Sequence, residues 1–216
     1  MRVGFTLTGE TPLLIHADDV EQSDRLKEWR DAPEHKNISV PGDDRSPAWT
    51  WQTYLYSDGE HVTCPADNIM AALRNAGAKM TMKRQTTFKS ATQSGLVIPT
   101  EYCELRIDGK QVPISEIDEI RDQPFKVQCE KVKQHGFKLF VKRAAVGQTK
   151  HVRVRPRCEQ WSVHGEIHVM VPEITMEVLD RLFEIAGRQS GLMDWRPSSK
   201  KSPGPYGMFS AKLKAM

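Results

Sequence analysis

The residues of this chain best suited to chemistry are the cations of one segment, residues 126–157. Ten basic residues lie there against a single acid, Glu130. The ten are Lys126, Lys131, Lys133, Lys138, Lys142, Arg143, Lys150, Arg153, Arg155 and Arg157. An arginine guanidinium is a planar fork that fits a phosphate, and its flat surface can stack on a base. This excess of positive charge predicts a polyanionic partner, and the alternative is a solvated basic surface with no ligand.

Alternating apolar residues in the same segment predict a set of strands or a long ribbon. The apolar positions are Val127, Cys129, Phe137, Leu139, Val141, Val152 and Val154. On a strand, Arg153, Arg155 and Arg157 would share one face at intervals of about 6 to 7 Å, close to the spacing of phosphates along an extended single strand. We therefore expect single-stranded RNA or DNA as the partner. The sequence leaves both open, because the two differ at a site by contacts to a 2′-hydroxyl.

A second basic segment lies between residues 79 and 100, which contain no acid. Its cations are Lys79, Lys83, Arg84 and Lys89, and Met80, Met82 and Phe88 are interleaved with them. Cations mixed with apolar side chains suit a segment that touches both phosphates and bases. The alternative is a flexible loop.

The third candidate is a loop rich in Gly and Pro at residues 191–209, where glycines permit close backbone approach. Its rings and cations are Trp195, Tyr206, Phe209, Arg196, Lys200 and Lys201. We expect the loop to lie beside the basic segment and to stack on bases through Trp195 or Tyr206. The alternative is a structural plug in which Trp195 belongs to the core.

Signals for metal binding and catalysis are weak. The cysteines are Cys64, Cys103, Cys129 and Cys158. They form no CxxC pair, so we expect free thiols in a reducing compartment. His164 and His168 would share a strand face but lack a third nearby ligand, and the paired carboxylates at residues 18–19 and 43–44 are also typical of solvated loops. Because no phosphate-binding loop or GxSxG motif is present, we expect no metal, no cofactor and no enzymatic activity.

Hydrophobic periodicity predicts the elements that position these residues. Strands are expected at 3–7, 51–56, 96–98, 103–107, 161–171 and 208–213, and helices at 23–30, 65–77 and 174–186, with Gly77 ending the second helix. Their order predicts an α+β fold with a ferredoxin- or RRM-like β-α-β-β-α-β core. We expect a single domain over residues 1–216, with insertions at about 17–50 and 108–157. The acidic residues 111–124 are expected to be a surface connection.

Composition limits the class of protein. A chain of 216 residues that is 38% hydrophobic and 27% charged is typical of a soluble globular protein with its own core. The net charge of +3 is too small to indicate nucleic acid by itself. No apolar run is long enough to cross a bilayer, and the alternating residues 1–7 are unlike a signal peptide. We expect a cytoplasmic protein with no membrane partner.

Two stretches resemble the RAMP superfamily, the RRM-like subunits of CRISPR effector complexes. They are PADNIMAALRNAG at residues 65–77 and the glycine-rich GLMDWRP…GPYGMF at 191–209. The segment RPRCEQW at 155–161 is also similar to the central strand of the backbone subunits of that family. The resemblance implies an RRM-like fold and nucleic-acid binding. It also implies possible partners, either further copies of the chain or effector-complex subunits, and a stand-alone relative is equally compatible.

Three functions follow from these observations. The first is non-catalytic binding of single-stranded nucleic acid, with copies that could assemble along the strand. The second is a metal-independent ribonuclease, which the family resemblance suggests, with His16 or His35 as acid–base group. The third is an assembly factor whose basic face binds an acidic protein partner. Steep salt dependence would favour the first two over the third.

Overall fold

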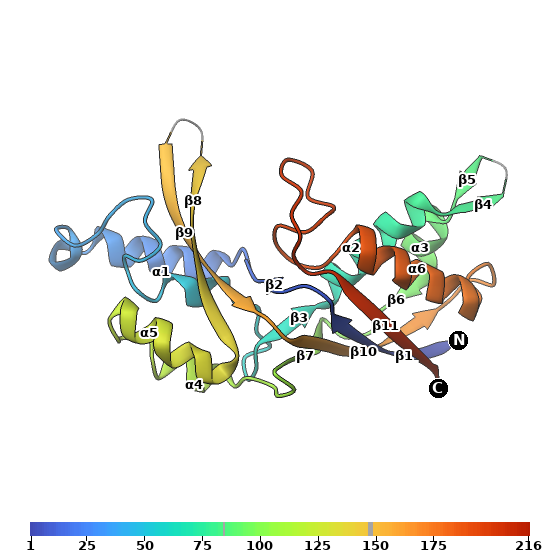
Figure 1. Ribbon diagram of the computed structural model, residues 1–216, viewed down its shortest axis with the longest axis horizontal. Coiled ribbons are helices and arrows are strands. Elements are labelled where there is room, and N and C mark those ends of the chain that lie inside the picture. Colours follow the sequence, from blue (N-terminus) through green and yellow to red (C-terminus); the bar gives the residue numbers. More distant parts are fainter. Residues whose placement is uncertain (84, 147–148) are drawn as a thin grey trace. The chain divides into compact units, whose positions relative to one another are not determined.

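The computed structural model describes residues 1–83, 85–146 and 149–216, with only the backbone described at 145, 146 and 149. The fold is α+β with antiparallel sheets (Figure 1). The chain divides into two compact units. Unit 1 comprises Met1–Leu14, Thr63–Gln111 and Glu159–Met216, and unit 2 comprises Ile15–Val62 and Val112–Cys158. The sequence predicts insertions at about 17–50 and 108–157, and nearly all of these residues belong to unit 2.

Unit 1 is built on one antiparallel sheet in the order β11-β1-β10-β7-β3, with the short strand β6 also paired to β10. The strands are β1 Arg2–Gly9, β3 Thr63–Pro65, β6 Leu96–Val97, β7 Tyr102–Ile107, β10 Trp161–Val169 and β11 Phe209–Ala215. A two-residue strand, β2 Leu13–Leu14, follows β1. Val3, Phe5 and Leu7 of β1 are buried while the residues between them are partly exposed. The predicted alternation of this strand is therefore confirmed.

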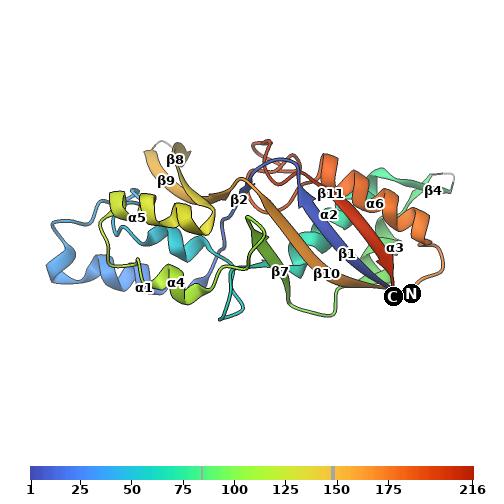
Figure 2. The same ribbon diagram turned by 60° about the horizontal axis from the view of Figure 1, so that its bottom comes forward.

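Helices α2 Ala66–Lys79 and α6 Met176–Gln189 cover one face of this sheet (Figure 2). The side chain of Thr175 caps α6 by accepting a hydrogen bond from the Val178 amide at 3.3 Å, and threonine is a favoured residue at this position. Gly187 lies where α6 meets β11, and a side chain there would collide with the Phe209 carbonyl. The absence of a side chain at Gly187 thus sets the packing distance between helix and strand.

The prediction that Gly77 ends α2 is wrong, because the helix continues to Lys79. Gly77 serves packing instead, since a Cβ there would lie 2.6 Å from the Thr92 hydroxyl oxygen of α3, Lys89–Gly95. Two short strands, β4 Thr81–Lys83 and β5 Thr86–Thr87, form a hairpin between α2 and α3. A glycine inside a helix can therefore mark a contact surface rather than a helix end.

Unit 2 combines short helices with one two-stranded ribbon. The elements are α1 Val20–Asp31, the 3₁₀-helices η1 Pro33–His35 and η2 Thr50–Tyr54, α4 Ile114–Asp118, α5 Phe125–Lys131, the 3₁₀-helix η3 Val132–His135, and the strands β8 Phe137–Val146 and β9 Thr149–Cys158. The first helix begins at Val20, three residues before the predicted start, and Asp19 caps it. Two predicted strands are wrong, because residues 51–54 are 3₁₀-helical and residues 127–129 belong to α5.

A buried amide joins these two helical segments. The fully buried Trp51 donates its indole N–H to Gln128 Oε1 at 2.6 Å, and Gln128 is itself buried. The amide nitrogen of Gln128 donates to the carbonyls of Arg121 and Gln123 at 2.9 and 2.8 Å. Every polar atom of this side chain is therefore satisfied, as burial requires. Because a side chain makes these bonds, their partners do not appear in an alternating hydrophobic pattern.

A buried carboxylate ties β9 to the rest of unit 2. Asp44 is 1% exposed and accepts hydrogen bonds from the Tyr54 hydroxyl at 3.0 Å, the Val154 amide at 3.1 Å and the Arg153 guanidinium at 3.2 Å. Burial, followed by the charge of Asp44, raises the pKa of Tyr54 to about 12. The phenol therefore remains a neutral donor. Three donors on one carboxylate offset much of the cost of burying its charge.

We expect Asp44→Ala to lower the free energy of unfolding by about 3–5 kcal/mol, because it leaves Arg153 and a buried amide without their acceptor. Urea denaturation followed by tryptophan fluorescence measures this loss. The matched control is Asp43→Ala, which removes the adjacent carboxylate and its ion pair with the half-exposed Arg45. That control should cost about 1 kcal/mol or less. Equal losses in the two variants would contradict the role given to Asp44.

Candidate nucleic-acid interface

The β8–β9 pairing gathers most of the predicted arginines and two lysines on one side of a ribbon. Lys138 lies opposite Arg157, Phe140 opposite Arg155, and Lys142 opposite Arg153. Directly opposed residues of antiparallel strands point to the same face. We call this set of six residues the ribbon face. The other side of the ribbon buries Phe137, Val154 and Cys158 completely, which fixes which side chains point away from the core.

The charge of the ribbon face is unbalanced within the two strands. Neither FKLFVKRAAV nor TKHVRVRPRC contains an acid. The face also carries a ring, because the guanidinium carbon of Arg157 lies 5.7 Å from the centroid of Phe140. A surface that combines a row of cations with an aromatic ring offers contacts to both phosphates and bases.

Arg153 is the exception on this face. Its ion pair with Asp44 leaves its side chain only 30% exposed. The carboxylate neutralises part of the charge that a phosphate would otherwise meet. Arg153 therefore has a structural task, which the arginine spacing in the sequence did not reveal.

Five of the ten cations of this segment lie off the ribbon face, and one of them is Lys126, in α5. Arg143 is opposite Val152, and Lys150 is opposite Ala145, so both belong to the other side of the ribbon. Lys131 ends α5 and Lys133 lies in η3, where it pairs with Glu130 at 2.6 Å. Lys131 and Lys133 lie off the ribbon face because the segment begins with helix. Arg143 and Lys150 lie on the strands, at positions that alternate with those of the ribbon face.

The predicted binding residues outside this segment belong to unit 1. Lys83 ends β4 and Lys89 begins α3, and both are exposed. Arg84 lies outside the described residues. Lys200 and Lys201 are also exposed. Phe88 is 7% exposed, so it belongs to the core instead of the proposed stacking surface.

The 191–209 loop is folded upon itself. The rings of Trp195 and Tyr206 lie 5.4 Å apart at an angle of 34°, and a side chain at Gly204 would collide with Trp195. Arg196 donates to the Met193 carbonyl and, at 3.1 Å, to the Ser198 hydroxyl. Phe209 is 1% exposed and is therefore a core residue. Lys200 and Lys201 remain the exposed predicted cations of this loop.

The histidines that could support catalysis are engaged in structural contacts. His16 packs on Tyr54 with ring centroids 4.5 Å apart. His35 stacks on Trp29 at 4.1 Å and its Nδ1 donates to the carbonyl of that residue at 2.9 Å. His164 lies between the hydroxyls of Thr6 and Ser162, at 3.2 and 3.0 Å. Each of these histidines therefore contacts residues of its own unit.

Charged and sulfur groups of unit 1 show no metal-like arrangement. His168 pairs with Glu166 at 2.7 Å, and hydrogen bonds from Arg2 and His168 lower the pKa of Glu166 to about 2. Cys64 and Cys103 are opposite each other on β3 and β7, and burial raises the pKa of Cys103 to about 11. Within residues 1–83, 85–146 and 149–216, no three His, Cys, Asp or Glu side chains gather as metal ligands would.

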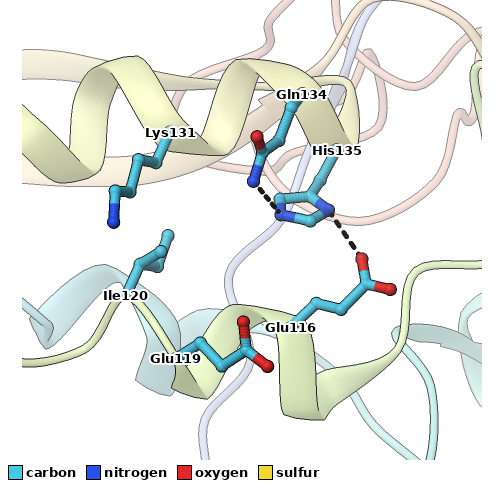
Figure 3. A pocket seen from close by; sticks show the side chains of 6 residues that line it. All are labelled: Glu116, Glu119, Ile120, Lys131, Gln134 and His135. Atoms are coloured by element: carbon cyan, nitrogen blue, oxygen red, sulfur yellow. Dashed lines mark hydrogen bonds and ion pairs between the residues drawn. The ribbon is translucent and has the colours of Figure 1, made fainter.

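Unit 2 contains a pocket that the sequence does not predict. Its volume is about 490 Å³, and it lies between α4 and the α5–η3 helices (Figure 3). The lining residues are Glu116, Glu119, Ile120, Lys131, Gln134 and His135. His135 joins Glu116 Oε2 at 3.1 Å through Nδ1 and the Gln134 amide at 3.0 Å through Nε2. The acidic segment 111–124, predicted as a mere surface connection, supplies one wall of this pocket.

The chain matches no protein-family model and no curated protein. Throughout the described part of the chain, no helix has the length and apolar character needed to cross a membrane.

We expect Trp195 and Tyr206 to stabilise the loop as a pair. A double-mutant cycle of Trp195→Ala and Tyr206→Ala should give a coupling free energy of about 0.5–1.5 kcal/mol, because tilted rings attract beyond their buried area. Thermal and urea melts of the four proteins measure it. Additive losses would show that the rings act independently, and a loss of oligonucleotide binding by Tyr206→Ala with normal melting would point to base stacking instead.

Proposed function

We propose that the chain binds single-stranded nucleic acid, either RNA or DNA, through the ribbon face and without catalysis. The observation that carries the proposal is the strand register that opposes Lys138 to Arg157 and Lys142 to Arg153, with Phe140 between them. Successive arginines of β9 are about 6 to 7 Å apart, and the two lysines of β8, which lie on either side of Phe140, are about 13 Å apart. A flexible single strand can place its phosphates on such a row while a base meets the ring.

The topology of unit 1 supports a ferredoxin- or RRM-like frame. The elements β1, α2, β7, β10, α6 and β11 follow one another as strand, helix, two strands, helix and strand, with other segments between them. In the sheet the same strands lie in the order β11-β1-β10-β7. We interpret this as a β-α-β-β-α-β core that carries unit 2 as insertions. It is the arrangement that the RAMP resemblance implies.

An acidic protein is the competing partner for the same face. The Phe140 ring and the alternation of cations favour a nucleic acid, because a protein partner requires a complementary surface shape more than a regular charge spacing. Copies of the chain that assemble along a strand are compatible with this proposal and would appear as cooperative binding to longer strands. A complex with other effector subunits is also compatible with it.

Removing cations from the ribbon face should weaken binding more than removing the same charge elsewhere. We expect Lys138→Ala, Lys142→Ala and Arg155→Ala together to reduce the slope of log affinity against log salt by roughly two to three units, close to one for each lost phosphate contact. Fluorescence anisotropy with labelled single strands at several salt concentrations measures this. Duplexes of the same sequence should bind less tightly.

The control for charge is Lys126→Ala, Arg143→Ala and Lys150→Ala, three substitutions off the ribbon face. This variant should keep most of the affinity and slope of the parent. An equal loss of affinity in both triple variants would show that net charge, and not the ribbon face, determines binding. No weakening in a correctly folded ribbon-face variant would eliminate the proposed interface.

We expect labelled RNA and DNA to remain intact during incubation with the purified protein, with or without Mg²⁺. His16 and His35 are packed on the rings of Tyr54 and Trp29, so both imidazoles serve packing. Denaturing gels follow the strand length over time. Cleavage that His16→Ala or His35→Ala abolishes would establish the ribonuclease alternative.

A further inference from the structure

The pocket of Figure 3 combines an acceptor and a donor that have no internal partner. Among the described residues, neither the Glu119 carboxylate nor the Lys131 ammonium forms an ion pair, although both line the same pocket. Ile120, which is 3% exposed, supplies an apolar wall between them. The volume of about 490 Å³ falls within the range of small-ligand sites. Two opposite charges held apart around an apolar wall suit a ligand that presents both donors and acceptors.

The rest of the lining is fixed by hydrogen bonds. The amide nitrogen of Gln134 can only donate, so His135 Nε2 accepts its bond and Nδ1 carries the ring proton. That proton is donated to Glu116 at 3.1 Å. His135 is only 10% exposed at its side chain. One wall of the pocket is therefore held in a single arrangement before any ligand binds, which lowers the entropy lost on binding.

The charges of the pocket exclude a phosphate as its occupant. Glu116 and Glu119 would repel an anion, and Lys131 alone does not offset two carboxylates. A nucleobase is neutral and carries a fixed pattern of donors and acceptors along its edge. A carboxylate can accept two parallel hydrogen bonds from adjacent N–H groups. Guanine offers such adjacent donors at N1 and N2, with the acceptor O6 beside them for a lysine.

We propose that this pocket binds a guanine base presented by a single strand that lies on the ribbon face, an inference that rests on the proposed function. Glu119 accepts from guanine N1–H and N2–H, and Lys131 donates to O6. Adenine and cytosine would turn a ring-nitrogen acceptor toward the carboxylate, and uracil has only one N–H on that edge. The pocket therefore gives the protein a preference for one base. The ribbon face does not supply such a preference, because it contacts phosphates.

The pocket and the ribbon face are adjacent along the chain. His135 ends η3, and Lys138 is the second residue of β8. Three residues span at most about 11 Å, which is less than two nucleotides of extended strand at the phosphate spacing given above. A strand held at the Lys138 end of the ribbon face thus has a base within reach of the pocket. Recognition of unpaired bases by hydrogen bonds at their edges is how proteins read single strands.

The test compares three short RNAs in an anisotropy assay with the full chain. One contains only uridine, one has a central guanosine, and one has inosine at that position, which lacks the N2 amino group. We expect the guanosine RNA to bind roughly 5- to 150-fold more tightly than the uridine RNA, with inosine between them. Glu119→Gln should abolish the advantage of guanosine without weakening the binding of the uridine RNA, because it removes a charge that repels the backbone.

The control variant is Glu130→Gln, which removes one acid from the adjacent helix α5 without altering the pocket lining. It should retain the preference for guanosine. If the parent binds the uridine RNA but shows no preference, the guanine pocket is wrong and the ribbon-face proposal stands. If no RNA binds at low salt, both proposals fail. A preference that survives Glu119→Gln places recognition elsewhere, and competition by free GMP as strong as by the RNA would show that the ligand is a nucleotide and not a strand.

Discussion

The buried carboxylate of Asp44 is the interaction on which the ribbon of unit 2 depends. It binds the Val154 amide and the Arg153 side chain of β9, and it also accepts from Tyr54 in η2. Donors from β9 and η2 converge on this carboxylate, so it anchors the middle of β9 and helps to hold the cations of that strand in a fixed row. The negative charge is thus placed beneath the basic face, where it lowers the repulsion among the arginines that the face requires.

This arrangement divides the arginines of β9 between two tasks. Arg153 reaches the Asp44 carboxylate, whereas Arg157 lies over the Phe140 ring. The register sets Lys138 opposite Arg157 and Lys142 opposite Arg153, and like charges that are directly opposed repel each other. A polyanion bound to this face would reduce that repulsion.

Sequence reasoning succeeded where one physical signal dominated. The strands β1, β7 and β10 and the helix α6 were predictable because burial on one face imposes a period of two or 3.6 residues. It failed where single polar contacts decide the structure, as for Trp51 and Gln128, whose mutual hydrogen bond lies within helices that the sequence predicts as strands. The ribbon cations were found from composition, but the pocket was missed, because Glu119 and His135 belong to segments that show no pattern until they are folded together.

The two candidate surfaces of unit 2 differ in the kind of interaction that they offer. Cations on the ribbon face act over a Debye length, about 8 Å at physiological salt, and under the proposed function they would attract any single strand regardless of sequence. The Glu119–Lys131 pocket acts only at hydrogen-bond distance, and its carboxylates repel the same backbone that the ribbon face attracts. A base can enter such a pocket only after its phosphates are held elsewhere. Under the proposed function, electrostatics would set the order of events, with capture on the ribbon face preceding discrimination among bases in the pocket.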